Sequence, residues 1–206
     1  MATGFYAVAH NVLTHEQRTQ LVAGITQSEF YGPSALGEEF VQTYGFSVVF
    51  CRRALGVIHQ ELPFIATLLH SALFESCNAF YVNSLVLTSN SRVDSHVDCR
   101  LIPATDIRII PNLVSVYYAE VSPQMSGGRL ILNPDTTNEV AILPESGDLV
   151  HFVGSVIHRV EAVTAVCRRV SVVCEQYCLD DKALSAFPVC EIITGGSPFQ
   201  RLNAMN

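Results

Sequence analysis

The stretch His96-Val97-Asp98 constrains the fold of this 206-residue chain more than any other. In an extended strand, residues two apart point to the same side, so His96 and Asp98 are expected to face one point. A third candidate ligand, His158, begins another strand pattern far along the chain. Two imidazoles and one carboxylate match the facial triad that holds non-haem Fe(II) with coordination positions left open. The pattern therefore predicts a metal site where distant strands converge.

His151 is the alternative third ligand. It lies inside a strand pattern, on the side opposite its neighbours Val150 and Phe152. His158 follows a turn and begins a new strand, which is a better position for a ligand, so we favour His158. The other histidines fall in the predicted helical part and are expected to be surface or packing residues: His10, His15, His59 and His70.

The composition describes an apolar, acidic chain whose length fits one domain. Hydrophobic residues make up 49%, which is ample for a core, and the formal net charge is -7. The 12 basic residues form no run, which disfavours a nucleic-acid partner because such binding relies on clustered lysine and arginine. No apolar run approaches the roughly 18 residues of a membrane span, and no signal-peptide pattern is visible. We therefore expect a soluble, cytoplasmic protein.

The seven cysteines form no CxxC pair and no regular framework. We interpret most of them as small buried hydrophobic residues in a reducing compartment. Cys174 and Cys178, four residues apart, resemble a ligand pair, but nothing supplies the rest of a zinc site. The cysteines are Cys51, Cys77, Cys99, Cys167, Cys174, Cys178 and Cys190.

The chain divides into a helical front and a strand-rich remainder. Thr14 and Gln17 have the spacing of a capping box, and apolar residues recur at helical spacing over residues 53–74, with a break at Pro63. Closely spaced strands separated by turn residues favour either an α+β layer arrangement or a β-barrel with helices packed outside. The predicted strands are residues 46–50, 81–88, 114–119, 129–132, 139–143, 148–153, 157–163 and 168–173, with a turn at 89–91 and a short helix at 181–186.

Arg168 and Arg169 form a candidate anion clamp. Strand alternation sends one of the two side chains inward and the other outward. Val170 follows the face of Arg168 and Ser171 that of Arg169, which leaves the choice open. A guanidinium buried in a barrel needs a carboxylate partner, and a bidentate ligand would supply it. The alternative is that both arginines are exposed edge residues.

Several motifs occur in an order that resembles the 2-oxoglutarate- and Fe(II)-dependent dioxygenases. The chain looks closest to their prolyl 4-hydroxylase-like branch, which includes the PKHD-type hydroxylases. The similarity covers residues 82–177 and extends to the helical opening around Thr14. The motifs are His96-Val97-Asp98, Tyr117-Tyr118, Gly127-Gly128 followed by Arg-Leu-Ile-Leu, the run of residues 144–152, His158 and Arg168.

The resemblance implies a double-stranded β-helix, a jelly-roll or cupin-like barrel, with supporting N-terminal helices. We expect a single 2-oxoglutarate/Fe(II) oxygenase domain over residues 1–206. Helical support would occupy about residues 1–78, the barrel core about 79–178 and a C-terminal extension 179–206. Gly127-Gly128 would be a tight turn with a structural role. The long segment 99–112 has no clear counterpart in the family and is interpreted as a lid or substrate loop.

The resemblance also implies a ligand set. His96, Asp98 and His158 would bind Fe(II), and the cosubstrate 2-oxoglutarate would chelate it through the keto-acid end. Arg168 would pair with the distal carboxylate, since this branch commonly places its basic anchor nine or ten residues after the distal histidine. Tyr118 would hydrogen-bond the same carboxylate, with the preceding tyrosine facing the other way.

The implied activity couples oxidative decarboxylation of 2-oxoglutarate, with O2 and with ascorbate as a reductant, to hydroxylation of a C–H bond. Retention of Asp98 favours hydroxylation over halogenation, because related halogenases replace this carboxylate. The expected substrate is a prolyl or other peptidyl residue, and the alternative is a small molecule or free amino acid. A rival from another class is a non-catalytic, cupin-like metal sensor, but the histidine or glutamate expected near His96 is missing.

Overall fold

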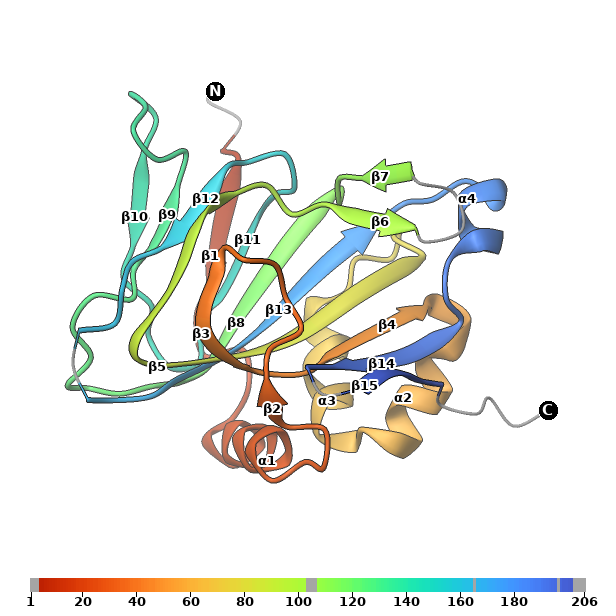
Figure 1. Cartoon of the computed structure of the whole chain (residues 1–206), viewed down its shortest axis with the longest axis horizontal. Helices are drawn as coiled ribbons and strands as arrows, with labels where there is room; N and C mark the ends of the chain where they lie inside the picture. Colours follow the sequence, from red (N-terminus) through yellow and green to blue (C-terminus); the bar gives the residue numbers. More distant parts are fainter. Residues whose placement is uncertain (1–3, 103–106, 165, 196, 202–206) are drawn as a thin grey trace.

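An antiparallel sheet curls into an open barrel, and the helices of the first 72 residues gather on one of its outer sides (Figure 1). The computed structural model describes residues 4–102, 107–164, 166–195 and 197–201. The arrangement is the double-stranded β-helix expected from the motifs. In the part of the chain that the structure describes, no helix is long and apolar enough to cross a membrane.

The helices form where capping and proline signals predict them. Thr14 caps the first helix through a complete capping box with Gln17, and Pro63 begins a new helix after a break at Leu62. The short C-terminal helix has the predicted bounds. The helices are α1 (His15–Thr26), the 3-10 turn η1 (Arg52–Ala54), α2 (Leu55–Glu61), α3 (Pro63–Ala72) and α4 (Asp181–Ala186).

The main sheet contains every strand predicted after residue 78. Its order is β1 (Tyr6–Ala9), β11 (Leu149–Val153), β8 (Leu113–Val121), β13 (Arg169–Tyr177), β5 (Ala79–His96), β12 (His158–Val160), β9 (Leu130–Leu132) and β10 (Val140–Ile142). Off this path lie β2 (Gly32–Pro33), β3 (Phe40–Gly45), β4 (Ser47–Cys51), β14 (Cys190–Thr194) and β15 (Ser197–Arg201). A separate hairpin joins β6 (Arg100–Ile102) to β7 (Ile107–Ile109).

Three parts of the sheet differ from the prediction. The helical front contributes β1 and β3 in addition to the predicted β4, and the C-terminal extension contributes β14, which pairs with β4. The strand β1 has four exposed residues, so it carries no apolar alternation and is held by backbone pairing with β11. Edge strands of this kind have no side-chain pattern that a sequence reveals.

The predicted turn at residues 89–91 is a bend inside one long strand. β5 runs without interruption from Ala79 to His96, with Asn90 in the left-handed region at φ 70°. Its first half pairs with β13 up to Leu87, and its last part pairs with β12 from Val93. The strand thus passes from one sheet of the barrel to the other and carries His96 to β12.

The sheet separates two apolar layers. The outer layer packs the helices against one face of the strands and includes Tyr117, Val170 and Val172. The inner layer fills the barrel and includes Tyr118 and Phe152. Because both faces of the central strands are buried, these strands are apolar on both sides.

Candidate metal centre and anion site

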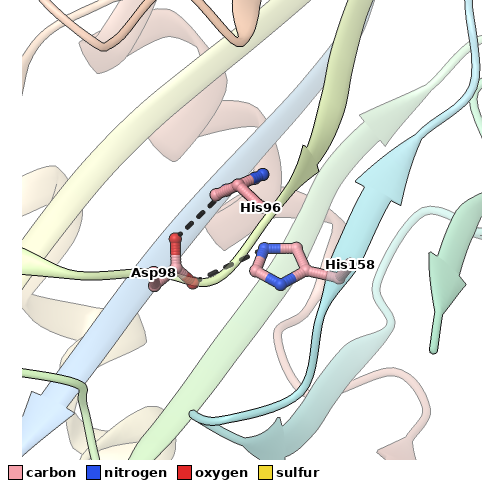
Figure 2. Close-up of side chains that lie close together, drawn as sticks. All are labelled: His96, Asp98 and His158. Carbon is pink, nitrogen blue, oxygen red and sulfur yellow. Dashed lines mark ion pairs between the residues drawn. The ribbon is translucent and has the colours of Figure 1, made fainter. Parts of the chain in front are cut away.

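The barrel brings the three predicted ligands to one place. His96 is the last residue of β5 and Asp98 follows it, while His158 begins β12 directly opposite His96 in the antiparallel ladder. Figure 2 shows the three side chains pointing toward one another from these two segments. Their ligand atoms all lie within 4.8 Å of one another.

The ring orientations leave one nitrogen of each histidine facing Asp98. Nδ1 of His96 lies 2.9 Å from the carbonyl oxygen of Asp94, and Nδ1 of His158 lies 3.1 Å from that of Val156. The Nε2 atoms face Asp98 at 3.4 and 3.5 Å (Figure 2), which is longer than a good hydrogen bond. Metal-binding histidines commonly donate their other ring N–H to a backbone carbonyl in this way, since the contact fixes the tautomer.

The electrostatics of Asp98 and His158 favour the charge states that a metal needs, whereas a cation would have to displace a proton from His96. Burial opposes ionisation of Asp98, but the two histidines hold its pKa below the ordinary value. Burial lowers the pKa of His158, with Asp98 acting in the opposite direction. Burial also acts to lower the pKa of His96, but Asp98 raises it above the ordinary value. A carboxylate beside a buried neutral imidazole is the form that binds a cation.

The polar atoms at the centre of this group lack protein partners. Nε2 of His96 and Oδ2 of Asp98 are buried without a hydrogen bond among the described residues. Buried polar atoms are normally satisfied, so these two atoms indicate a missing ligand. The two nitrogens and the carboxylate fit a divalent ion such as Fe(II), with positions left open for further ligands.

A cavity of about 470 Å³ extends inward from the three ligands. Arg169 and Tyr118 lie in its wall on one side, with Leu130 and Val160 beside them. The wall also contains Asn83 and Glu175 from the central strands. The segment before β3 contributes Leu36, Gly37 and Glu39, and Phe40 packs edge-on against the His96 ring with centroids 5.1 Å apart.

Arg169 is the buried guanidinium of the barrel. It is 1% exposed, donates from Nη1 to the carbonyl oxygen of Gly128 at 2.6 Å, and lies 4.9 Å from the centre of the Tyr118 ring. Its Nε and the hydroxyl of Tyr118 have no hydrogen-bond partner among the described residues. Burial lowers the pKa of Arg169, and burial raises that of Tyr118. A buried cation beside an unsatisfied hydroxyl could hold an anion, because a carboxylate would satisfy both.

Arg168 does not face this cavity, so the predicted orientation of the arginine pair is corrected. Its side chain is exposed and forms two hydrogen bonds with the carboxylate of Glu120, at 2.7 and 2.9 Å. The inward position belongs to Arg169. Both faces of β13 contain buried residues, so its apolar pattern did not show which of the two arginines points into the barrel.

The other predicted positions have clear structural partners. His151 lies on the outer face and is hydrogen-bonded to Ser115 at 2.7 Å. His10 is paired with Asp148 at 2.8 Å. Gly127 has φ 77°, and an added Cβ would lie 1.9 Å from the carbonyl oxygen of Ala162, which explains the need for glycine in this turn.

Sequence reasoning missed the polar wall between β4, β5 and β13. The Tyr81 hydroxyl donates to Oγ of Ser47 at 2.8 Å, and Ser47 donates to Oδ1 of Asn83 at 3.3 Å. These hydrogen bonds fix the Asn83 amide in the cavity wall. Glu175 lies in the same wall and accepts a hydrogen bond from the Tyr177 hydroxyl. The signal available in the sequence was the polar residues at alternate positions of two otherwise apolar strands.

The predicted lid over residues 99–112 is described only in part. Its backbone forms the β6–β7 hairpin, and residues 103–106 lie outside the described chain. Cys99, next to Asp98, is exposed and lines the cavity. The hairpin therefore begins at the mouth of the metal site.

Solved structures share this fold, whereas sequence comparison finds no relative. No model of a protein family matches the chain, and no curated protein matches it in sequence. A Pseudomonas putida prolyl-4-hydroxylase is similar over 87% of this chain and 95% of its own, at 16% identity and a TM-score of 0.60. A Trichoplax adhaerens prolyl hydroxylase, solved with a hypoxia inducible factor peptide, matches over 89% and 88% at 16% identity and a TM-score of 0.57. HygX from Streptomyces hygroscopicus, solved with nickel and 2-oxoglutarate, matches over 84% and 82% at 10% identity and a TM-score of 0.51.

Proposed function

We propose that the protein is a non-haem Fe(II) dioxygenase that couples oxidative decarboxylation of 2-oxoglutarate to hydroxylation of a C–H bond. One observation carries the proposal: a group of two histidines and a carboxylate shares a cavity with a buried guanidinium. A metal sensor needs only the two histidines and the carboxylate. A dicarboxylate cosubstrate that binds the metal needs the guanidinium as well, for its second carboxylate.

The residues of the chain have distinct roles in this proposal. His96, Asp98 and His158 would hold the metal, and the backbone carbonyl oxygens of residues 94 and 156 fix the orientations of the two rings. Fe(II) with 2-oxoglutarate and O2 supplies the oxidising chemistry, and ascorbate serves as a reductant. Apolar residues such as Leu130 and Val160 keep water from the cosubstrate.

Arg169 takes the role that the motif pattern suggested for Arg168. Its buried guanidinium would pair with the distal carboxylate of 2-oxoglutarate, and the Tyr118 hydroxyl would donate to the same group. The Gly128 carbonyl oxygen already orients one end of the guanidinium, which leaves Nε directed to another acceptor. HygX, which has the same fold, binds 2-oxoglutarate and a metal together.

For the substrate, we propose a peptidyl residue, notably proline. Two proteins with this fold are named prolyl hydroxylases, and one of them holds a peptide. The cavity of about 470 Å³ must hold the cosubstrate together with the reacting group, so it suits a single side chain. The polar wall with Asn83 would then contact the substrate. A small molecule is the alternative, since HygX was also solved with hygromycin B.

The test is succinate formation from 2-oxoglutarate by the full chain with Fe(II), O2 and ascorbate. We expect slow uncoupled turnover alone and faster turnover with a substrate that gains one oxygen atom. Proline-containing peptides and free amino acids, compared by mass spectrometry, separate the two substrate classes. Metal binding without 2-oxoglutarate binding or succinate formation would favour the sensor and end the proposal.

A further inference from the structure

The thiols of Cys77 and Cys178 lie next to each other, outside the cavity of the candidate metal centre. Cys77 lies in the connection between α3 and β5, and Cys178 follows β13. Their Sγ atoms are 3.2 Å apart, and no other two thiols lie within hydrogen-bond distance among the described residues. Cys178 is exposed, whereas Cys77 is 2% exposed. A disulfide has a sulfur separation of about 2.05 Å, so a movement of roughly 1 Å closes the gap.

The backbones on both sides of this thiol pair are held in place. The side chain of Asn78 donates to the carbonyl oxygen of Leu179 at 2.8 Å and accepts from its N–H at 2.9 Å. Nε of Arg52 donates to the carbonyl oxygen of Cys77 at 2.7 Å. These hydrogen bonds join the residue after Cys77 to the residue after Cys178. The two sulfurs therefore meet in the folded chain without local unfolding.

We propose that Cys77 and Cys178 form a site of reversible oxidation, at which hydrogen peroxide oxidises Cys178 and Cys77 completes a disulfide. In the first step, the Cys178 sulfur attacks a peroxide oxygen and the O–O bond breaks. Cys178 becomes a sulfenic acid, and the hydroxide that leaves takes up the thiol proton as water. In the second step, the Cys77 sulfur attacks the Cys178 sulfur, the S–O bond breaks and a second water leaves. Two thiols are oxidised and one hydrogen peroxide is reduced.

The different exposure of the two thiols indicates which one reacts with peroxide and which one completes the disulfide. Peroxide reaches the exposed Cys178 first. Burial and the neighbouring Cys178 sulfur together raise the pKa of Cys77 to about 11. Cys77 therefore keeps its proton until Cys178 has been oxidised. The hydroxide that leaves the sulfenic acid accepts this proton in the second step.

The disulfide would connect two segments that bracket the barrel core. The loop between residues 77 and 178 contains every strand from β5 to β13. Closing a loop of this length restricts the unfolded chain strongly, so the oxidised protein is expected to be the more stable form. This inference does not depend on the proposed oxygenase activity.

The experiment treats the reduced full-length chain with hydrogen peroxide in the presence of a chelator, which excludes iron–peroxide chemistry. We expect the loss of two hydrogen atoms in the intact mass and a peptide that links residues 77 and 178, both reversed by dithiothreitol. The melting temperature of the oxidised form should rise by roughly 5–10 °C.

Single variants test the assigned roles. Cys77→Ser should let the Cys178 sulfenic acid accumulate, where dimedone traps it, whereas Cys178→Ser should abolish the disulfide. Cys167→Ser is the matched control, because this half-buried thiol lies away from the pair and should leave the disulfide intact. A disulfide between other cysteines would overturn the proposal. So would direct conversion of Cys178 to the sulfonic acid while Cys77 stays reduced.

Discussion

The inner and outer faces of the barrel wall are both buried, yet they carry different chemistry. On β13, Arg169 points into the cavity while Arg168 points outward to Glu120. On β8, Tyr118 faces the cavity while Tyr117 packs under the helices. The inner face is polar where a ligand is needed, and the outer face is apolar where helices cover it. Adjacent residues of the same type therefore provide matched variants for separating ligand binding from packing.

The largest effect is expected from replacing a residue of the candidate metal centre. Asp98→Ala removes the carboxylate that both histidines face, so we expect metal affinity to fall by more than about 100-fold and succinate formation to be lost. Metal titration and the succinate assay measure the two effects. The melting temperature of the metal-free chain is the control, and an active Asp98→Ala protein would place the metal elsewhere.

Replacement of the inner arginine should give the second-largest effect. Arg169→Ala removes the buried cation, and loss of a charge-assisted pair of roughly 2–5 kcal/mol corresponds to about a thirty-fold or greater rise in the KM for 2-oxoglutarate. The matched variant Arg168→Ala should leave this KM unchanged. If the two variants exchanged phenotypes, the inner and outer assignments would have to be reversed.

The contrast between these two arginines shows what the sequence can and cannot predict. His96 and Asp98 could be proposed together because a two-residue spacing in extended chain is a local rule, although β5 ends at His96 and Asp98 lies just beyond it, and His158 follows a recognisable turn. The facing of Arg169 was not predictable from apolar pattern, since Val170 and Val172 on the other face are equally buried. A rule based on which face of β13 carries polar residues beside the arginine would have predicted the orientation of Arg169 better.

That rule follows from the residues that share the face of Arg169. Ser171 and Glu175 are polar and buried on this face, whereas Val170, Val172 and Cys174 occupy the other. On the helix-covered face the buried amide of Gln176 is satisfied by the chain itself, through Phe74, Ala72 and Ser115, whereas a ligand cavity accepts polar groups that a ligand can satisfy. Asn83 was missed for a different reason. Its contact with Ser47 depends on the pairing of β4 with β5, a long-range register that local spacing does not encode.

The adjacent tyrosines 117 and 118 test the same difference between the two faces, with a smaller expected effect. Tyr118→Phe removes one hydroxyl from the anion site, and a hydrogen bond to a charged group contributes roughly 1.5–3 kcal/mol, so the KM for 2-oxoglutarate should rise about ten-fold or more. Tyr117→Phe changes a residue of the outer layer and should leave this KM within about two-fold. Equal shifts in both variants would indicate a general loss of packing in place of a specific contact.

The outer arginine should give the smallest effect, on stability alone. Arg168 and Glu120 form an exposed ion pair with side chains 44% and 37% accessible, and such pairs contribute about 0–1 kcal/mol. Arg168→Ala should therefore lower the free energy of unfolding by less than about 1 kcal/mol. High salt screens exposed charges, so the difference should shrink further in denaturant titrations at about 1 M NaCl. A loss that persists in high salt would mean that Arg168 supports the wall through packing of its aliphatic stem, and the two faces would then differ less than their charges indicate.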